Sequence, residues 1–265
     1  MNKFSGKAGS YLLHTHLTTW IILAICGFLS GFIDSTVGGG GLVSLPALLL
    51  VGLPPAAALG TNKLAGTLSA LTSTLSYLRS GKVTYRLIAP AFPLGVIGAV
   101  VGAIVVHHLP STFLRPLVLG LLVVVAGYTL WNKKLGLNTE RPDLTSRTFI
   151  WTCLAALVVG FYDGFFGPGT GSFLMMIFVL LGFNFVNASG NARTLNFASN
   201  LGALTAFLFL RAVHYEDGLV LGACMVIGAL VGSQFAIRKG ARYVRPIFIL
   251  VTCVVIVQQI YTLLS

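Results

Sequence analysis

The stretch that decides the fold occurs twice, as GFIDSTVGGGG at residues 31–41 and as GFYDGFFGPGTG at residues 160–171. In each copy an apolar segment ends at an aspartate, and a glycine-rich turn leads into a second, shorter apolar segment. The match extends further, because GTNK at residues 60–63 corresponds to GNAR at residues 190–193. An offset of 129 to 130 residues, held over more than 80 residues, indicates two copies of one structural unit.

The composition excludes a water-soluble globular domain. Of the 265 residues, 56% are hydrophobic and only 9% are charged, whereas a soluble domain carries about 25% charged residues. With about 20 residues for each transmembrane helix, the chain has room for about eight to ten apolar segments. We therefore expect an all-α polytopic membrane protein, in which residues 1–265 form a single transport domain with about eight full transmembrane helices.

Two apolar segments, at residues 42–53 and 172–183, are too short to cross a bilayer alone. Twelve helical residues cover about 18 Å of a hydrocarbon core about 30 Å thick. The sequence therefore predicts that both are broken or re-entrant helices. We place the first repeat at residues 17–131, a cytoplasmic linker at 132–147 and the second repeat at 148–264.

The charge distribution predicts that the two copies have opposite orientations. The net charge of +11 would suggest a nucleic acid partner in a soluble protein, but here it fits basic cytoplasmic loops. Three loops, at residues 79–86, 133–147 and 238–245, hold most of the positive charge. Equivalent loops of the two copies differ in charge, which is typical of inverted repeats.

Asp34 and Asp163 occupy equivalent positions and are expensive to place inside a bilayer. We expect both carboxylates to face a cavity and to couple transport to protons. The glycine turns that follow leave backbone N–H groups free where each short helix begins, next to Gly40 and Gly169. Such helix starts favour anions.

Lys63 and Arg193 are the matching basic residues, and we expect each to lie near the start of a helix that follows a polar turn. Both cations suit an anionic substrate. The remaining candidates for substrate binding are polar neighbours on the same segments: Thr61, Asn62, Asn191, Asn196 and Asn200.

A structural role is the alternative for the same residues. Asp34 with Lys63, and Asp163 with Arg193, would then form buried ion pairs that hold the broken helices and never touch substrate. Asn196 and Asn200 would be hydrogen-bonding contacts between helices. The sequence leaves these alternatives open.

The doubled motif resembles the TauE/SafE family of membrane permeases and, within it, the YfcA-like branch. The resemblance rests on residues 31–41, 58–63 and 160–168 and extends over about residues 20–262. It implies a multi-pass transporter of the bacterial inner membrane that moves sulfite, a sulfonate or a related organosulfur anion, commonly as an exporter.

Nucleotide-binding, zinc-protease and serine-hydrolase motifs are absent from the sequence, so we expect no enzyme activity, no cofactor and no metal site. The expected partners are a small anion and the lipid bilayer, without nucleic acid, and a homodimer stays open.

The rival functions are a cation or metal permease that uses Asp34 and Asp163 as ligands, and a membrane scaffold without transport activity. The two matched cations disfavour the first rival, and the cost of buried charge disfavours the second.

The first testable prediction concerns topology. Because the basic loops should all be cytoplasmic, cysteines that replace Lys134 and Lys239 in a cysteine-free background should react with impermeant reagents from the same side. Accessibility labelling in oriented vesicles measures this. Labelling from opposite sides would contradict the inverted arrangement.

Overall fold

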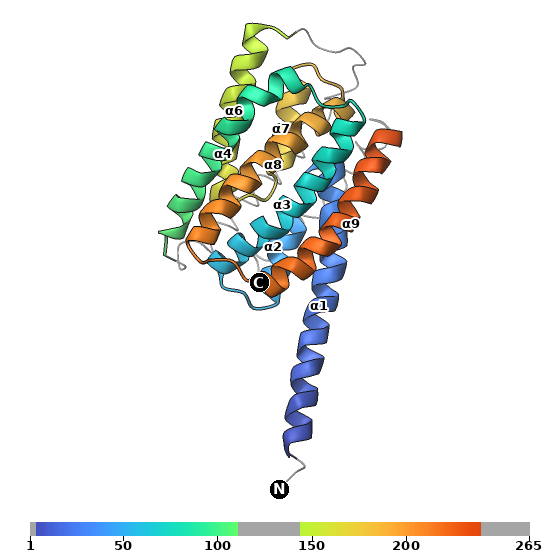
Figure 1. The fold of residues 1–265 in the computed structure, drawn as a ribbon, viewed down its shortest axis with the longest axis vertical. Helices are drawn as coiled ribbons and strands as arrows, with labels where there is room; N and C mark the ends of the chain where they lie inside the picture. Colours follow the sequence, from blue (N-terminus) through green and yellow to red (C-terminus); the bar gives the residue numbers. More distant parts are fainter. Residues whose placement is uncertain (1–3, 111–143, 240–265) are drawn as a thin grey trace, which may run out of the picture.

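The computed structural model describes residues 4–110 and 144–239, with side chains from residue 17 onward, and it confirms the predicted all-α class for them. These residues form helices joined by short turns (Figure 1). The helices are α1 (Phe4–Val37), α2 (Gly41–Leu50), α3 (Pro55–Arg79), α4 (Tyr85–His107), α6 (Ser146–Phe165), α7 (Thr170–Leu180), α8 (Phe185–Phe209) and α9 (Tyr215–Lys239). The segments expected at residues 113–131 and 244–264, and most of the linker, lie outside the described residues.

Four of the described helices contain a span long and apolar enough to cross a membrane, namely Leu17–Val37 within α1, α4, α6 and α9. The predicted short segments are confirmed as the short apolar helices α2 and α7. Helices α3 and α8 have 25 residues each but carry many polar side chains, most of which are buried. The total of about eight spans stays a prediction.

Helices α3 and α8 begin earlier than the sequence predicted. Pro55 starts α3, where its fixed φ suits a first helical position. The Asn184 side chain caps α8 by accepting a hydrogen bond from the backbone N–H of Asn187. Lys63 and Arg193 therefore lie well inside continuous helices, and the expected helix starts beside them are wrong.

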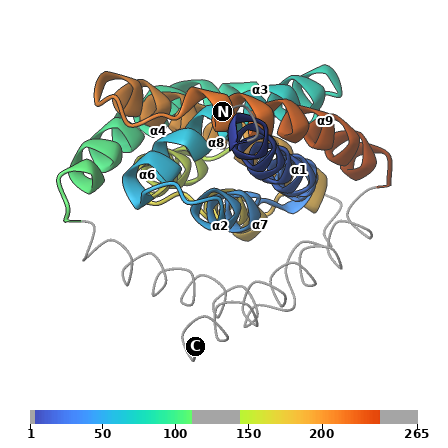
Figure 2. The ribbon, with the colours of Figure 1, turned by 90° about the horizontal axis from the view of Figure 1, so that it is seen from below.

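The two copies pack against each other through equivalent pairs of helices. Helix α1 packs along α9 and α6 packs along α4, while α3 packs on α9 and α8 packs on α4. The central helices α3 and α8 also contact each other. In the end-on view of Figure 2, α3 and α9 lie on one side of the bundle and the short helices α2 and α7 on the opposite side.

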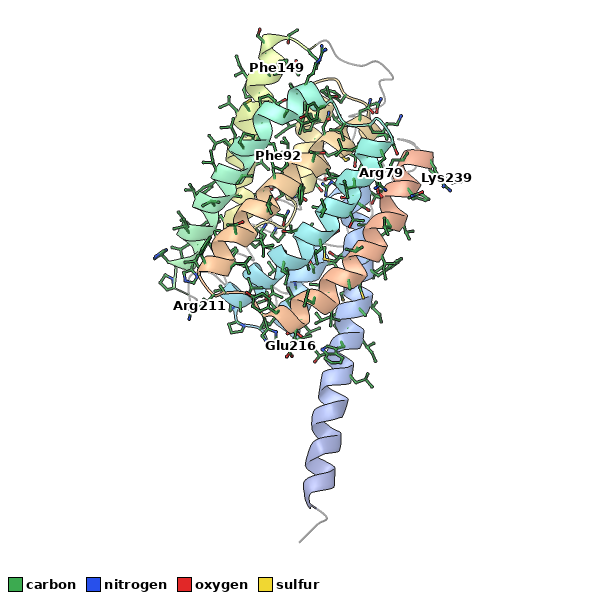
Figure 3. All side chains as sticks on the ribbon, in the orientation of Figure 1. Arg79, Phe92, Phe149, Arg211, Glu216 and Lys239 are labelled. Carbon is green, nitrogen blue, oxygen red and sulfur yellow. The ribbon has the colours of Figure 1, made fainter. Side chains whose placement is uncertain are left out.

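Equivalent helices end at opposite ends of the bundle. Arg79, at the end of α3, lies at the same end as Lys239, whereas Arg211, just after α8, lies at the other end with Glu216 (Figure 3). The described parts of two basic loops therefore share one end of the molecule. The N-terminal part of α1 extends beyond the bundle at the opposite end (Figure 1).

Close helix contacts require glycine at matched positions. A Cβ atom on Gly98 of α4 would overlap the carbonyl oxygen of Leu157 on α6, and a Cβ atom on Gly228 of α9 would overlap that of Phe28 on α1. These glycines therefore allow the close packing of the helices.

We predict that Gly98→Ala and Gly228→Ala each destabilise the protein by about 1–3 kcal/mol, because the added methyl group forces packed backbones apart. Thermal unfolding of the purified protein in detergent measures the effect. Val231→Ala is the control, since Val231 lies on α9 with 48% of its surface exposed. Unchanged unfolding in both glycine variants would refute the packing role.

Candidate functional site

Each broken helix turns back through glycines in a left-handed conformation. Gly38 and Gly39 have φ angles of +79° and +106°, and Gly167 and Gly169 have +98° and +86°. Side chains with a Cβ rarely adopt these angles, so the glycine runs are a backbone requirement. The turns bring the N-terminal end of each short helix beside the aspartate that ends the preceding segment.

The aspartates contact these helix starts directly. The backbone N–H of Gly40 donates to Oδ1 of Asp34 at 3.3 Å. In the second copy, the Thr170 hydroxyl donates to Oδ1 of Asp163 at 2.8 Å. Each aspartate side chain therefore lies at the N-terminal end of a short helix, where the helix dipole attracts negative charge.

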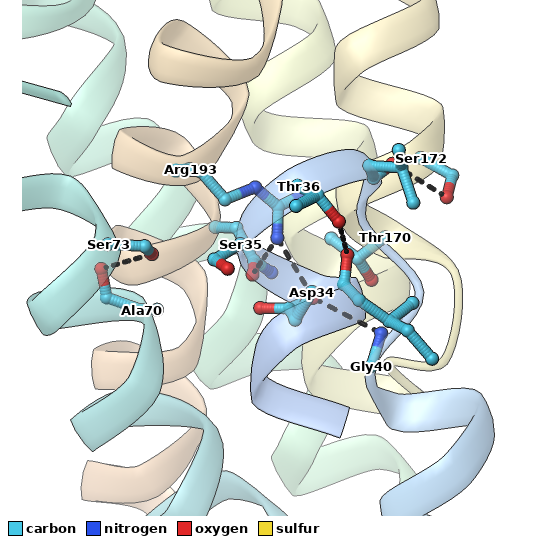
Figure 4. A network of polar contacts seen from close by, with 12 residues as sticks. Asp34, Ser35, Thr36, Gly40, Ala70, Ser73, Thr170, Ser172 and Arg193 are labelled. Atoms are coloured by element: carbon cyan, nitrogen blue, oxygen red, sulfur yellow. Dashed lines mark hydrogen bonds and ion pairs between the residues drawn. The ribbon is translucent and has the colours of Figure 1, made fainter. Parts of the chain in front are cut away.

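The buried ion pairs cross between the two copies. Lys63 Nζ lies 2.7 Å from Oδ1 of Asp163. Arg193 Nη1 lies 2.9 Å from Oδ1 of Asp34, and Figure 4 shows this second pair. The pairing within each copy that the sequence left open is therefore wrong. Helices α3 and α8 contact each other at the centre of the bundle, and each carries its cation to the aspartate of the other copy.

A small polar cavity of about 30 Å³ lies between the two helix starts. By volume it has room for about two water molecules. Both aspartates, Lys63, three asparagines and glycines of the two turns and of α3 line it. The lining residues are Asp34, Asp163, Lys63, Asn62, Asn196, Asn200, Gly39, Gly41, Gly66, Gly167, Gly169, Gly171, Ser44, Thr170 and Met225. Gly40 lies in the same turn, directly before α2.

Arg193 is fully buried but is not among the residues that line the cavity. Its Nη1 atom contacts Asp34 and, at 3.5 Å, the side-chain oxygen of Asn196. Its Nε and Nη2 atoms are buried, and within residues 4–110 and 144–239 they have no hydrogen-bond partner. Unsatisfied buried donors are costly, so this guanidinium has unused capacity to bind an acceptor.

Two predicted site residues lie away from the cavity. Thr61 Oγ1 accepts a hydrogen bond from the backbone N–H of His214, and Asn191 Oδ1 accepts one from the backbone N–H of Thr84. These equivalent contacts tie each central helix to the residue that precedes α9 or α4. In the structure, Thr61 and Asn191 therefore connect the two copies and do not line the cavity.

Several residues of the site were missed in the sequence. Ser199 donates to Oδ2 of Asp163 at 2.6 Å, and Ser44 donates to the side-chain oxygen of Asn62 at 2.6 Å. Thr170 could have been found, because it directly follows the glycine turn that the motif marks. Ser44 and Ser199 carry no such signal, since small hydroxyl residues are common inside membrane helices.

Hydroxyl groups from three other helices hold the broken end of α1. Three successive carbonyl oxygens at that end each accept a hydrogen bond from a different helix. The donors are Tyr77 of α3 to Ser35 at 2.8 Å, Ser189 of α8 to Thr36 at 3.0 Å and Ser172 of α7 to Val37 at 3.3 Å. Carbonyls at a helix end lack partners within the helix, so these contacts position Asp34.

The crossed pairing predicts a pattern of energetic coupling. Removing one partner of a buried ion pair costs about 3–5 kcal/mol, because the other charge is left uncompensated. Lys63→Gln and Asp163→Asn should therefore be non-additive in unfolding free energy, and coupled more strongly than the matched control pair Lys63→Gln and Asp34→Asn. Double-mutant cycles measured by denaturation test this. Equal coupling in both cycles would contradict the pairing.

Comparison with known proteins gives consistent matches. Residues 23–258 match the family model described as sulfite exporter TauE/SafE. A probable membrane transporter protein of a Sinorhizobium species, ORF9, is 40% identical over 89% of this chain and 90% of its own length. A probable membrane transporter protein of Haemophilus influenzae is 35% identical over 91% of this chain and 94% of its own length. YfcA of Escherichia coli K12, also a probable membrane transporter protein, is 34% identical over 91% of this chain and 89% of its own length. The chain therefore belongs to the TauE/SafE family of membrane transporters.

Proposed function

We propose that this protein is a secondary transporter that carries a small anion, namely sulfite, a sulfonate or a related organosulfur oxyanion, across the bacterial inner membrane. One observation carries the proposal. The starts of two broken helices, one from each copy, line the same buried cavity together with Lys63. The family description, sulfite exporter, supports the choice of sulfur oxyanions as the substrate class.

The chemistry of the cavity favours an anion over a cation. Helix starts, an ammonium group and amide N–H groups all stabilise negative charge. Both carboxylates are already bound by cations, at 2.7 Å and 2.9 Å. Among the residues that the structure describes, no group of three or more metal-ligating side chains gathers, so the cation-permease alternative gains no support.

An inverted arrangement of the two copies is part of the proposal. The opposite directions of α3 and α8 support it, as do the matched contacts of equivalent helices. In transporters built from inverted repeats, the substrate site lies near the bilayer midplane where broken helices meet, and one repeat moves against the other to open each side in turn. The cavity between α2 and α7 suits that location.

The size of the cavity supports a coupled mechanism. A space for about two water molecules is too small for an oxyanion, so substrate must displace part of the ion-pair network. An anion that binds a cation of the site deprives one aspartate of its counter-charge. Protonation of that aspartate restores neutrality, which is the physical basis for anion–proton coupling.

Transport by the purified protein in proteoliposomes tests the proposal. We expect radiolabelled sulfite to enter, and an imposed pH gradient to change its accumulation. Radiolabelled manganese is the comparator for the cation-permease alternative. Manganese uptake without sulfite uptake, or uptake of neither, would reject the proposed function.

Substitution of the two cations gives a sharper prediction. A charge-assisted hydrogen bond to a buried anion contributes about 1.5–3 kcal/mol, so Lys63→Gln and Arg193→Gln should each weaken sulfite binding by about 10- to 100-fold. Titration calorimetry measures the affinity. Arg79→Gln is the matched control, because Arg79 is exposed at the end of α3. Wild-type affinity in both Lys63→Gln and Arg193→Gln, with normal folding, would refute the anion site.

A further inference from the structure

The two aspartates of the site are held very differently. Asp163 uses both carboxylate oxygens: Oδ1 accepts from Lys63 Nζ at 2.7 Å and from Thr170 at 2.8 Å, and Oδ2 accepts from Ser199 at 2.6 Å. Three short hydrogen bonds fix the orientation of this carboxylate. Asp163 is thus anchored to three helices.

Asp34 is held by one oxygen alone. Its Oδ1 atom contacts Arg193 Nη1 at 2.9 Å and the backbone N–H of Gly40 at 3.3 Å, and among the described residues no hydrogen bond reaches its Oδ2 atom. The Asp34 side chain is 12% exposed, against 2% for Asp163. Asp34 is therefore the carboxylate that a water molecule or a proton in the cavity can reach.

The partner of Asp34 also has unused binding capacity. Nε and Nη2 of Arg193 form one edge of the guanidinium, and neither has a hydrogen-bond partner among the residues that the structure describes. This edge matches the two oxygens of a carboxylate, a sulfonate or a sulfite in a bidentate contact. The guanidinium packs against Gly38 and Gly171, where a Cβ atom would overlap it. Asp34 lines the cavity and Arg193 does not, so Asp34 must move before an anion can reach the guanidinium.

Few other charges face Asp34. The helices packed on α1 contribute Arg193 from α8 and Lys63 and Tyr77 from α3, and Asp163 of α6 lines the same cavity. Helices α2 and α7 contain no titratable side chain. The charged residues of α9 lie in its first and last turns, and its Cys224 lies beside Gly27, two helical turns before Asp34.

We propose, on the basis of the proposed function, that Asp34 alone takes up the coupling proton. When a monovalent oxyanion enters, a proton from the same side binds Asp34, the protonated side chain leaves Arg193, and the anion binds the guanidinium in its place. Asp163 stays ionised on Lys63. The net charge of two cations and two carboxylates is zero, and the entry of a monoanion together with a single proton leaves it at zero. This matters because an uncompensated buried charge is costly. When the anion leaves, Asp34 releases its proton and returns to Arg193.

Proton counting during anion binding tests the assignment. Methanesulfonate is the probe, because it remains a monoanion throughout the working pH range and every proton taken up belongs to the protein. Titration calorimetry at one pH in buffers of different ionisation enthalpy gives the number of protons bound with each anion. Wild-type protein and Asp34→Glu should take up about one proton, whereas Asp34→Asn should bind methanesulfonate with none.

Infrared difference spectra provide a second readout, which does not depend on calorimetry. Methanesulfonate should produce one carboxylic acid C=O band, and the band should be absent in Asp34→Asn. Binding by wild-type protein without proton uptake, or full uptake by Asp34→Asn, overturns the assignment to Asp34 and leaves the proposed function intact. Failure of wild-type protein to bind both methanesulfonate and sulfite would instead reject the proposed function, and the assignment with it.

Discussion

The structure depends on two buried ion pairs that cross between its halves. Each cation comes from a central helix of one half and each aspartate from the broken helix of the other. Removal of any one of the four charged side chains would leave an uncompensated charge in a low-dielectric interior. The ion pairs therefore join the two halves at the points where the helices are interrupted.

Glycine makes this arrangement possible in two ways. Left-handed glycines reverse the chain after each aspartate, and they bring a helix start next to the carboxylate. Glycines within the long helices let backbones from the two halves touch, for example Gly60 beside the carbonyl oxygen of Ala212 and Gly190 beside that of Lys82. Close backbone contact excludes water and lipid, which strengthens the electrostatic interactions inside.

The equivalent halves have acquired unequal chemistry. Arginine reaches further than lysine and presents a planar fork, so Arg193 extends to Gly171 while the Lys63 ammonium group lies beside Gly167. Three hydroxyl groups hold the end of α1, and Asp163 is held by two hydroxyl groups of its own. A symmetric framework thus supports a site in which one ion pair is firmly anchored and the other can open.

The sequence by itself indicated the helical class, the two short helices and the four charged residues that form the buried ion pairs, because hydropathy and internal repetition can be read from the chain alone. It could not determine which cation binds which aspartate. A repeat shows which residues are equivalent, but contact depends on how α3 and α8 pack, and that packing places Lys63 on Asp163 and Arg193 on Asp34. The contacts of Thr61 and Asn191 could not be predicted either. Their partners are the backbone N–H groups of His214 and Thr84, and every residue except proline has such a group. Only the tertiary structure decided these contacts, because they join segments 100 or more residues apart, which no local pattern can relate.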